Sequence, residues 1–288
     1  MKKILIQFDT DTNPSSFDRV VAVDSGVDEL FSYGGIHKEN VEALVHGAIF
    51  TRGVKDLHST AIFIGGSDVS AGELLFDAVN KTFFGPMRVS VMMDSNGCNT
   101  TAVAAVLCAK KHLDLSTTKA LVLGGTGPVG QRSAELLARA GAEVRVASRS
   151  LSRAEDVCNR IAALTETSLL TPCTLNNEAE VNQVTEGVTL IIAAGAAGVQ
   201  LLSAEQLSNI ETLQVAIDLN AVPPAGLEGV SLTDKNENRS GVFCYGPIGV
   251  GNLKIKIHKE AINQLFSKND LLLDTTTIYN LGSEIDSI

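Results

Sequence analysis

Short apolar runs alternate along the chain with stretches in which apolar residues recur every three or four positions. The short runs have the length of buried strands, and the recurring pattern is that of helices with one packed face. We predict strands over 3–8, 61–64, 87–92, 120–123, 143–147, 168–173, 189–193 and 213–218, and helices over 17–23, 71–79, 102–113, 128–138, 151–164 and 178–184. This alternation indicates an α/β fold with parallel sheets, and 288 residues suffice for two such domains.

Other segments are less regular. Residues 41–45 have helical spacing, 48–50 resemble a strand, and the hydrophilic residues 233–240 predict a surface turn. Further on, Lys254, Lys256 and His258 alternate with apolar residues. In a helix Lys254 and His258 share one face, whereas in an extended chain all three share a face. A solvated surface and a site for an anionic or carbonyl-rich substrate are both compatible with this pattern.

The apolar run 120–123 stops at a glycine cluster that leads into a helical pattern. The cluster contains G-x-G-x-x-G, in which the first glycine makes a tight turn, the second admits a pyrophosphate and the third lets the helix pack on the strand. A preceding strand and a following helix favour a dinucleotide site over a glycine-rich turn without a ligand. We expect the phosphates to lie at the helix N-terminus, beside Gly125, Thr126, Gly127, Pro128, Val129 and Gly130.

The strand 143–147 ends where such domains bind the adenine ribose. NAD sites usually place an acidic residue there, but this chain has Ser148, Arg149 and, four residues further on, Arg153. Because an arginine can pair with a 2′-phosphate, we predict NADP rather than NAD as the cofactor. The alternative is that Arg149 and Arg153 are ordinary solvated residues at the start of a helix.

Small residues follow the strand 189–193, next to the expected position of the nicotinamide ribose. They permit close approach of the backbone to a ligand, although they could also mark a tight turn. We expect the cofactor to contact Ala194, Gly195 and Ala196 here, and Asn220 after the strand 213–218.

Polar residues follow two strands in the N-terminal third. Asp9 and Asp11 could bind a metal, but no further ligand cluster accompanies them, so we expect no metal and assign Asp9 to capping or to a substrate hydrogen bond. Residues 94–101 are rich in donors and acceptors, whereas an N-cap and turn would need only a few of them. We therefore expect Ser95 and Asn96 to contact a substrate.

The charge balance restricts the partners. With 23 basic and 33 acidic residues the net charge is −10, which argues against nucleic acid or an anionic membrane as a partner. The five cysteines have no metal-like spacing and indicate reduced thiols in a cytoplasmic protein. The apolar start of the chain ends at Asp9, which predicts a first strand rather than a signal peptide, and no apolar segment is long enough to span a bilayer.

Several separated segments together resemble the bacterial NADP-dependent methylene-tetrahydromethanopterin/methylene-tetrahydrofolate dehydrogenases. These segments are residues 8–11, 33–34, 50–53, 60–66, 83–86, 94–97, 125–130 and 249–258. The resemblance implies that a methylene-pterin adduct is oxidised to the methenyl form while hydride passes to NADP⁺. It also implies pterin contacts at Phe17, Asn96, Thr101, Lys254 and His258, a 2′-phosphate contact at Arg149, and a homo-oligomer, either a trimer or a hexamer.

The same resemblance implies two α/β domains with the pterin in the cleft between them. Residues 1–100 and 255–288 would form the pterin-binding and oligomerisation domain, and 101–254 the Rossmann-type NADP domain. The substrate's ring nitrogens supply the electrons for hydride loss, so the enzyme has to position the reactants and exclude water. We therefore predict that Lys254 orients the pterin rather than accepting a proton.

Two other functions are compatible with parts of the sequence. A shikimate-type NADP dehydrogenase would need a proton donor for its carbonyl substrate, and Lys254 or His258 could serve. A non-catalytic NADP-binding sensor would have no use for the polar residues 94–101. Short-chain dehydrogenases are excluded because no Tyr is followed four residues later by Lys, and zinc alcohol dehydrogenases because ligand clusters are missing.

Overall fold

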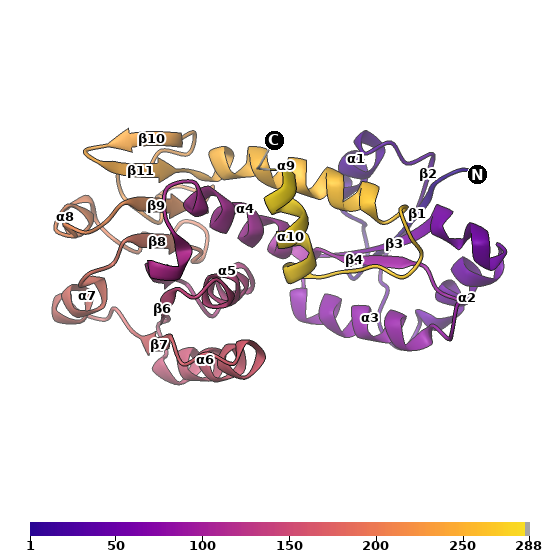
Figure 1. The fold of residues 1–288 in the computed structure, drawn as a ribbon, viewed down its shortest axis with the longest axis horizontal. Coiled ribbons are helices and arrows are strands. Elements are labelled where there is room, and N and C mark those ends of the chain that lie inside the picture. The colour runs from indigo at the N-terminus through magenta and orange to yellow at the C-terminus, as the bar shows by residue number, and fades with distance from the viewer. Residues whose placement is uncertain (286–288) are drawn as a thin grey trace. The chain divides into compact units, whose positions relative to one another are not determined.

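The computed structural model describes residues 1–285 and divides the chain into two compact units (Figure 1). Unit 1 contains Met1–Thr100 and the segment that begins at Ile255, and unit 2 contains Thr101–Lys254. Residues 286–288, which the sequence analysis assigns to the pterin-binding domain, lie outside the described residues. No helix among the described residues is both long and apolar enough to cross a membrane.

Unit 1 is built on a parallel sheet with the strand order β12-β4-β3-β1-β2. Its strands are β1 (Ile4–Asp9), β2 (Glu29–Tyr33), β3 (Thr60–Gly65), β4 (Ser90–Met93) and β12 (Leu272–Leu273). Its helices are α1 (Ser16–Asp24), α2 (Glu42–Phe50), α3 (Val69–Thr82) and α10 (Thr275–Ile285), with 3-10 turns at Val54–Ser59 and Ser95–Gly97. Because β3 and β4 are buried on both faces, the residues after the first of each strand are apolar or glycine.

Unit 2 contains a seven-stranded sheet with the order β10-β11-β9-β8-β5-β6-β7. Its strands are β5 (Lys119–Leu123), β6 (Glu143–Ala147), β7 (Leu170–Cys173), β8 (Leu190–Ala193), β9 (Val215–Asp218), β10 (Lys235–Arg239) and β11 (Val242–Tyr245). Its helices are α5 (Pro128–Arg139), α6 (Leu151–Thr165), α7 (Glu178–Thr185) and α8 (Ala204–Ser208), with a 3-10 turn at Leu115–Thr117. From β7 to β11 the order is that of a dinucleotide-binding fold, which confirms the predicted fold class.

Two helices carry residues of both units. They are α4 (Cys98–Lys110) and α9 (Pro247–Gln264). The helical form of α9 resolves the alternative left open by the sequence, because Lys254 and His258 are four residues apart in one helix and so share a face.

Two predictions of secondary structure are wrong. Residues 48–50 belong to α2, where the rings of His46 and Phe50, one turn apart, lie 5.3 Å from each other. Residues 233–240 contain the edge strand β10, which pairs with β11 in an antiparallel hairpin. All five residues of β10 are exposed, so no buried face marks it as a strand in the sequence.

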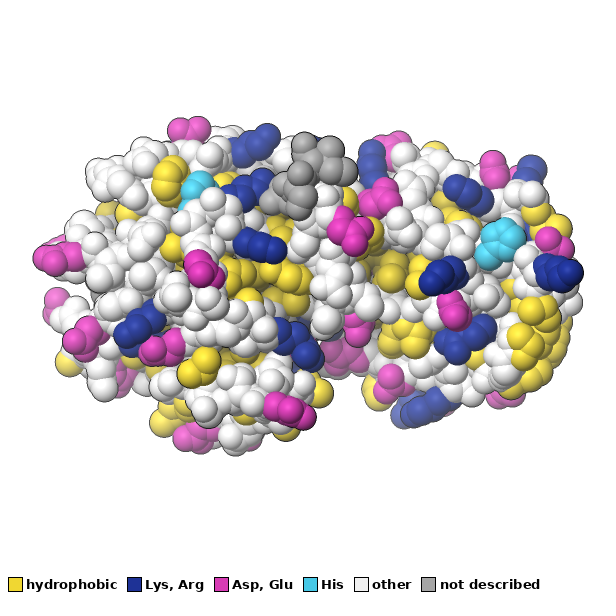
Figure 2. Space-filling model, in the orientation of Figure 1, with side chains coloured by type: hydrophobic (Ala, Val, Ile, Leu, Met, Phe, Trp, Pro, Cys, Tyr) yellow, Lys and Arg dark blue, Asp and Glu magenta, His cyan; other side chains and the backbone are white. Residues whose placement is uncertain are grey.

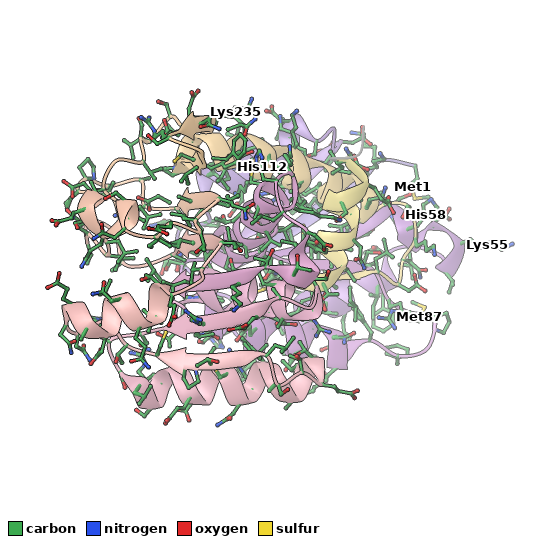
Figure 3. All side chains as sticks on the ribbon, turned by 60° about the vertical axis from the view of Figure 1, so that its left-hand side comes forward. Met1, Lys55, His58, Met87, His112 and Lys235 are labelled. Atoms are coloured by element: carbon green, nitrogen blue, oxygen red, sulfur yellow. The ribbon has the colours of Figure 1, made fainter. Side chains whose placement is uncertain are left out.

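The hairpin is held to the rest of unit 2 by His112, which follows α4. His112 is labelled in Figure 3. Its imidazole stacks on the ring of Phe243 with centroids 4.0 Å apart, and its Nε2 lies 2.8 Å from the hydroxyl of Tyr245. Burial, together with the nearby Lys111, lowers the pKa of His112, which favours the neutral ring that stacks here.

The first turn of α9 packs closely on the turn that precedes β10. The Ile248 N–H donates to the carbonyl of Leu232 over 3.0 Å. A Cβ added to Gly249 would lie 2.0 Å from the carbonyl oxygen of Asp234, whereas nothing would lie within 4 Å of one added to Gly251. This helix start therefore requires a glycine at 249 but not at 251.

We predict that Gly249→Ala destabilises the protein by about 2 kcal/mol or more, because the methyl group must displace a backbone carbonyl. Gly251→Ala, in the same helix, is the control and should raise stability by up to about 1 kcal/mol, since alanine loses less backbone entropy. Urea unfolding of both variants measures the difference. Equal stabilities of the two variants would show that the turn before β10 can shift away from the methyl group without loss of stability.

Candidate functional site

The dinucleotide turn of unit 2 is shaped by glycines at close backbone contacts. Gly124 has a φ of +67°, and its added Cβ would lie 2.6 Å from the Cα of Gly195 in the loop after β8. A Cβ added to Gly125 would lie 2.6 Å from Cγ1 of Val146. A Cβ added to Gly130 would lie 2.5 Å from the carbonyl oxygen of Gly124. The left-handed turn thus falls at Gly124, one residue before the position expected from the motif, while Gly125 permits packing against β6.

The start of α5 leaves backbone donors for an anion. Gly127 is its N-cap and has no side chain to accept from the first turn, and Pro128 occupies the first helical position. Gln131 of α5 donates from Nε2 to the carbonyl of Thr126 over 2.5 Å and so stabilises the glycine turn. A helix N-terminus of this kind fits a pyrophosphate.

A cavity of about 460 Å³ opens beside this turn, along the carboxyl ends of β5, β6 and β8. This is where the strand order reverses, the usual ligand site of such sheets. Of the predicted cofactor residues, those that line the cavity are Thr126, Gly127, Ser148, Arg149, Arg153, Ala194, Gly195 and Ala196. Those that do not are Gly125, Pro128, Val129, Gly130 and Asn220.

Arg149 and Arg153 offer positive charge at the β6 side of the cavity. Both are exposed, and within residues 1–285 neither guanidinium has an ion pair or a hydrogen bond. Beside them the hydroxyl oxygens of Thr126 and Ser148 lie 3.3 Å apart. Acidic and basic side chains are interspersed on the face drawn in Figure 2, so that face carries no broad basic patch among the described residues.

Asn220 has a supporting position rather than a place in the cavity wall. It is buried, its Oδ1 accepts from the N–H of Gly198 at 3.3 Å, and its Nδ2 donates to the carbonyl of Pro224 at 3.0 Å. Its own N–H donates to the buried carboxylate of Asp218 over 3.0 Å. Burial raises the pKa of Asp218, although backbone donors in the same loop oppose the shift. The pair therefore fixes the loop after β9.

In unit 1 the polar loops meet at the carboxyl ends of β1, β3 and β4. The strand order reverses around β1, so this edge is the expected ligand position of the second sheet. Asp9 is fully buried and accepts from the N–H groups of Asp11 and Ser15, both at 2.9 Å. Asp11 in turn accepts from the N–H and hydroxyl of Ser67 at 3.0 and 2.8 Å. These carboxylates hold the loops together.

Ser95 and Asn96 have different environments. Ser95 is buried, and its hydroxyl donates to the carbonyl of Gly65 over 3.1 Å. Asn96 is exposed and has a φ of +53°, a conformation that side chains other than glycine rarely adopt. Strain at an exposed polar residue is typical of functional loops, so the substrate contact predicted here fits Asn96 better than Ser95.

The helix after this loop starts earlier than predicted. It begins at Cys98 rather than Ala102, because the buried carboxylate of Asp94 accepts from the N–H groups of Asn99 and Thr100 and from the Thr100 hydroxyl. His258, also fully buried, lies with Nδ1 3.8 Å from Asp94 and stacks on Phe63. In this structure His258, like Asp9, belongs to the interior that supports the loops.

The remaining predicted substrate residues are accessible. Phe17 is 48% exposed at the start of α1, and Thr101 and Lys254 are half-buried in α4 and α9. The loop residues Leu175 and Asn176 also line the nucleotide cavity, and no sequence pattern predicts this. They lie far from the glycine motif along the chain and belong to no motif of their own.

Comparison with known proteins agrees with this geometry. A family model described as methylene-tetrahydromethanopterin dehydrogenase, N-terminal, matches residues 16–96, and the NAD dependent epimerase/dehydratase family matches residues 120–222. The bifunctional protein MdtA of Methylorubrum extorquens is 43% identical over 286 residues, or 99% of each chain. The NAD(P)-dependent methylenetetrahydromethanopterin dehydrogenase of the same organism is 31% identical and covers 94% of each chain.

Other matches are more limited. The NADP(+)-dependent shikimate dehydrogenase of Halorubrum lacusprofundi is 38% identical over 89 residues, 31% of this chain. Among solved structures, the ligand-free 5-ketofructose reductase of Gluconobacter superposes with a TM-score of 0.52 at 14% identity and covers 99% of both chains. This last likeness shows a shared fold.

We predict that Arg149→Gln raises the Kd of NADPH roughly 10- to 100-fold and leaves that of NADH unchanged, since a charge-assisted contact to the 2′-phosphate is lost. Arg139→Gln removes the same charge from α5, where Arg139 pairs with Glu135 outside the cavity, and should change neither constant. Calorimetric titration measures all four. If NADH binding weakened equally, Arg149 would not read the 2′-phosphate.

Proposed function

The chain belongs to the methylene-tetrahydromethanopterin dehydrogenase family, and from this membership we propose that it oxidises methylene-tetrahydromethanopterin to the methenyl form with hydride transfer to NADP⁺. The observation that carries the proposal is the match to a relative named for this activity, which is 31% identical and covers 94% of both chains. The 43% identity to the bifunctional protein MdtA, over 99% of both chains, supports it.

NADP fits the cavity of unit 2 on grounds of backbone shape and charge. The turn at Gly124 and Gly130 leaves no room for side chains where the backbone must come close, and Arg149 and Arg153 supply cations without internal partners among the described residues. When bound, NADP⁺ supplies the ring that accepts the hydride. The residues of this chain bind its phosphates at the start of α5 and its 2′-phosphate beside β6.

The oxidation itself asks for positioning rather than acid–base groups. The two ring nitrogens that flank the methylene carbon donate electron density as hydride leaves, and the resulting cation is spread over N–C–N. Placing the two reacting carbons in contact can supply roughly 7–11 kcal/mol. We assign this work to the accessible residues Phe17, Asn96, Thr101 and Lys254, with Asp9, Ser95 and His258 supporting their loops.

Lys254 orients the pterin rather than accepting a proton. An ammonium group close to the reacting carbon would disfavour the methenyl cation. We therefore assign Lys254 to binding polar groups of the pterin ring. Its position on α9, one turn before the buried His258, fixes the backbone from which it extends.

We also propose a homo-oligomer, either a trimer or a hexamer, and a cytoplasmic location. The family resemblance supports the first. The five cysteines support the second, since all are free and buried, as expected where thiols stay reduced.

The direct test is NADP⁺ reduction with methylene-tetrahydromethanopterin, methylene-tetrahydrofolate and shikimate in parallel. We expect turnover with the methanopterin substrate, and the ratio of kcat/KM between the two pterins identifies the carrier. Turnover of shikimate alone would refute the proposal and indicate a shikimate-type NADP dehydrogenase instead. NADPH binding without any turnover would indicate a sensor.

We predict that Lys254→Met lowers kcat/KM for the pterin at least about tenfold, the scale of one lost charge-assisted hydrogen bond. Lys256→Met removes the same charge from an exposed position on the same helix and should leave kcat/KM close to wild type. Steady-state kinetics of both variants decide the assignment. Full activity and full pterin affinity in Lys254→Met would refute it.

A further inference from the structure

The loop that joins β7 to α7 forms one wall of the nucleotide cavity through Leu175 and Asn176. Sheet order shows which end of the cavity this is. The strands run β8-β5-β6-β7, so the loop after β7 lies beyond β6 and Arg149, on the side opposite the loop after β8. With the nicotinamide at β8, this wall borders the adenine end.

This wall is held by one carboxylate that lies outside the cavity. Glu180 Oε2 accepts from the hydroxyl of Thr174 at 2.8 Å and from the N–H of Asn176 at 2.9 Å. These two residues flank Leu175, whose side chain packs against the apolar core of unit 2. The backbone donor of Asn176 and the hydroxyl of Thr174 hold the pKa of Glu180 below its ordinary value, so the acceptor is ionised at neutral pH.

The other oxygen of Glu180 is fixed by the helix cap. Oε1 accepts from Nδ2 of Asn177 at 2.9 Å, while Oδ1 of Asn177 accepts from the N–H of Glu180 at 3.0 Å. Asn177 thus caps α7 through the Glu180 N–H, and the Glu180 carboxylate in turn holds the Asn177 side chain in place. The position of the cavity wall is tied to the first turn of a helix and not only to the loop's own residues.

We propose that Glu180 is a positioning residue for the adenine half of the cofactor. Its carboxylate orders Thr174–Asn176 before the nucleotide arrives, so binding does not have to order this segment. The proposal rests on the proposed function, because it takes NADP as the ligand of this cavity.

The substitutions separate this role from general stability. Glu180→Ala removes all three acceptor contacts, whereas Glu180→Gln keeps an oxygen for Thr174 and Asn176 but turns an amide donor toward Nδ2 of Asn177. Glu178→Ala is the control, since Glu178 lies exposed in the same first turn and carries the same charge.

The experiment measures Kd by calorimetry for NADPH, NADH, adenosine 2′,5′-bisphosphate and nicotinamide mononucleotide, with Tm for each variant. We expect Glu180→Ala to raise the Kd of NADPH, NADH and the adenosine bisphosphate about tenfold. The NADPH-to-NADH ratio, the Kd of the mononucleotide and kcat at saturating NADP⁺ should stay unchanged. Glu180→Gln should fall between Glu180→Ala and wild type, and Glu178→Ala should match wild type.

Two results would overturn the inference. Binding by Glu180→Ala equal to that of Glu178→Ala would show that the wall needs no such support, and the same comparison with Glu180→Gln decides the matter if the alanine variant does not fold. Equal weakening of both halves, with a lowered Tm, would indicate a purely structural role. Wild-type protein that binds no NADPH would instead refute the cofactor itself, and pterin turnover tests the reaction separately.

Discussion

Both sheets depend on buried aspartates at the carboxyl ends of their strands. Asp9 ends β1, Asp94 follows β4 and Asp218 ends β9, and each is at most 1% exposed. Each accepts hydrogen bonds from backbone N–H groups of the segment that follows it, which for Asp94 is the first turn of α4. Backbone N–H groups beyond the end of a parallel strand have no partner in the sheet, and a buried carboxyl oxygen accepts from them where water is absent. Rigid loops at the ligand-bearing edge are the consequence.

This arrangement explains why polar loop residues fall into two groups. Some hold the loops in place, and others are exposed and available to a ligand. A buried carboxylate must use its lone pairs on nearby donors, because an unpaired buried charge would be costly. Asp9 and Asp94 do so and thereby present Asn96 and the start of α1 at the surface. Residue types that suit catalysis also suit this support. A cluster of polar residues in a sequence therefore indicates where a site lies, but it does not show which of its residues contact the ligand.

The sequence predicts the parts of the fold that burial dictates. Strands covered on both faces, such as β3 and β8, are continuous apolar runs, and the Rossmann turn has its own motif. The edge strand β10 has no buried residue, and edge strand β2 alternates exposed and half-buried residues, so β10 was predicted as a turn and β2 was not predicted at all. In the site, Arg149 could be predicted because its distance from the glycine motif is fixed by one βαβ unit. Leu175 and Asn176 could not, because only the sheet order brings them to the cavity.

In the cofactor site, the positive charge and the shape of the adenine end come from different elements. The charge proposed to recognise the 2′-phosphate belongs to Arg149 and Arg153 after β6, whose side chains are exposed and without internal partners in the described chain. The shape of the adenine end comes from the capped start of α7, where Glu180 fixes the neighbouring wall. On this proposal, a substitution of Arg149 would change the preference between NADP and NAD, and a substitution of Glu180 would change the affinity for both. Because Arg149 and Glu180 share no hydrogen bond or ion pair among the described residues, cofactor preference can diverge among relatives while the adenine wall keeps its form.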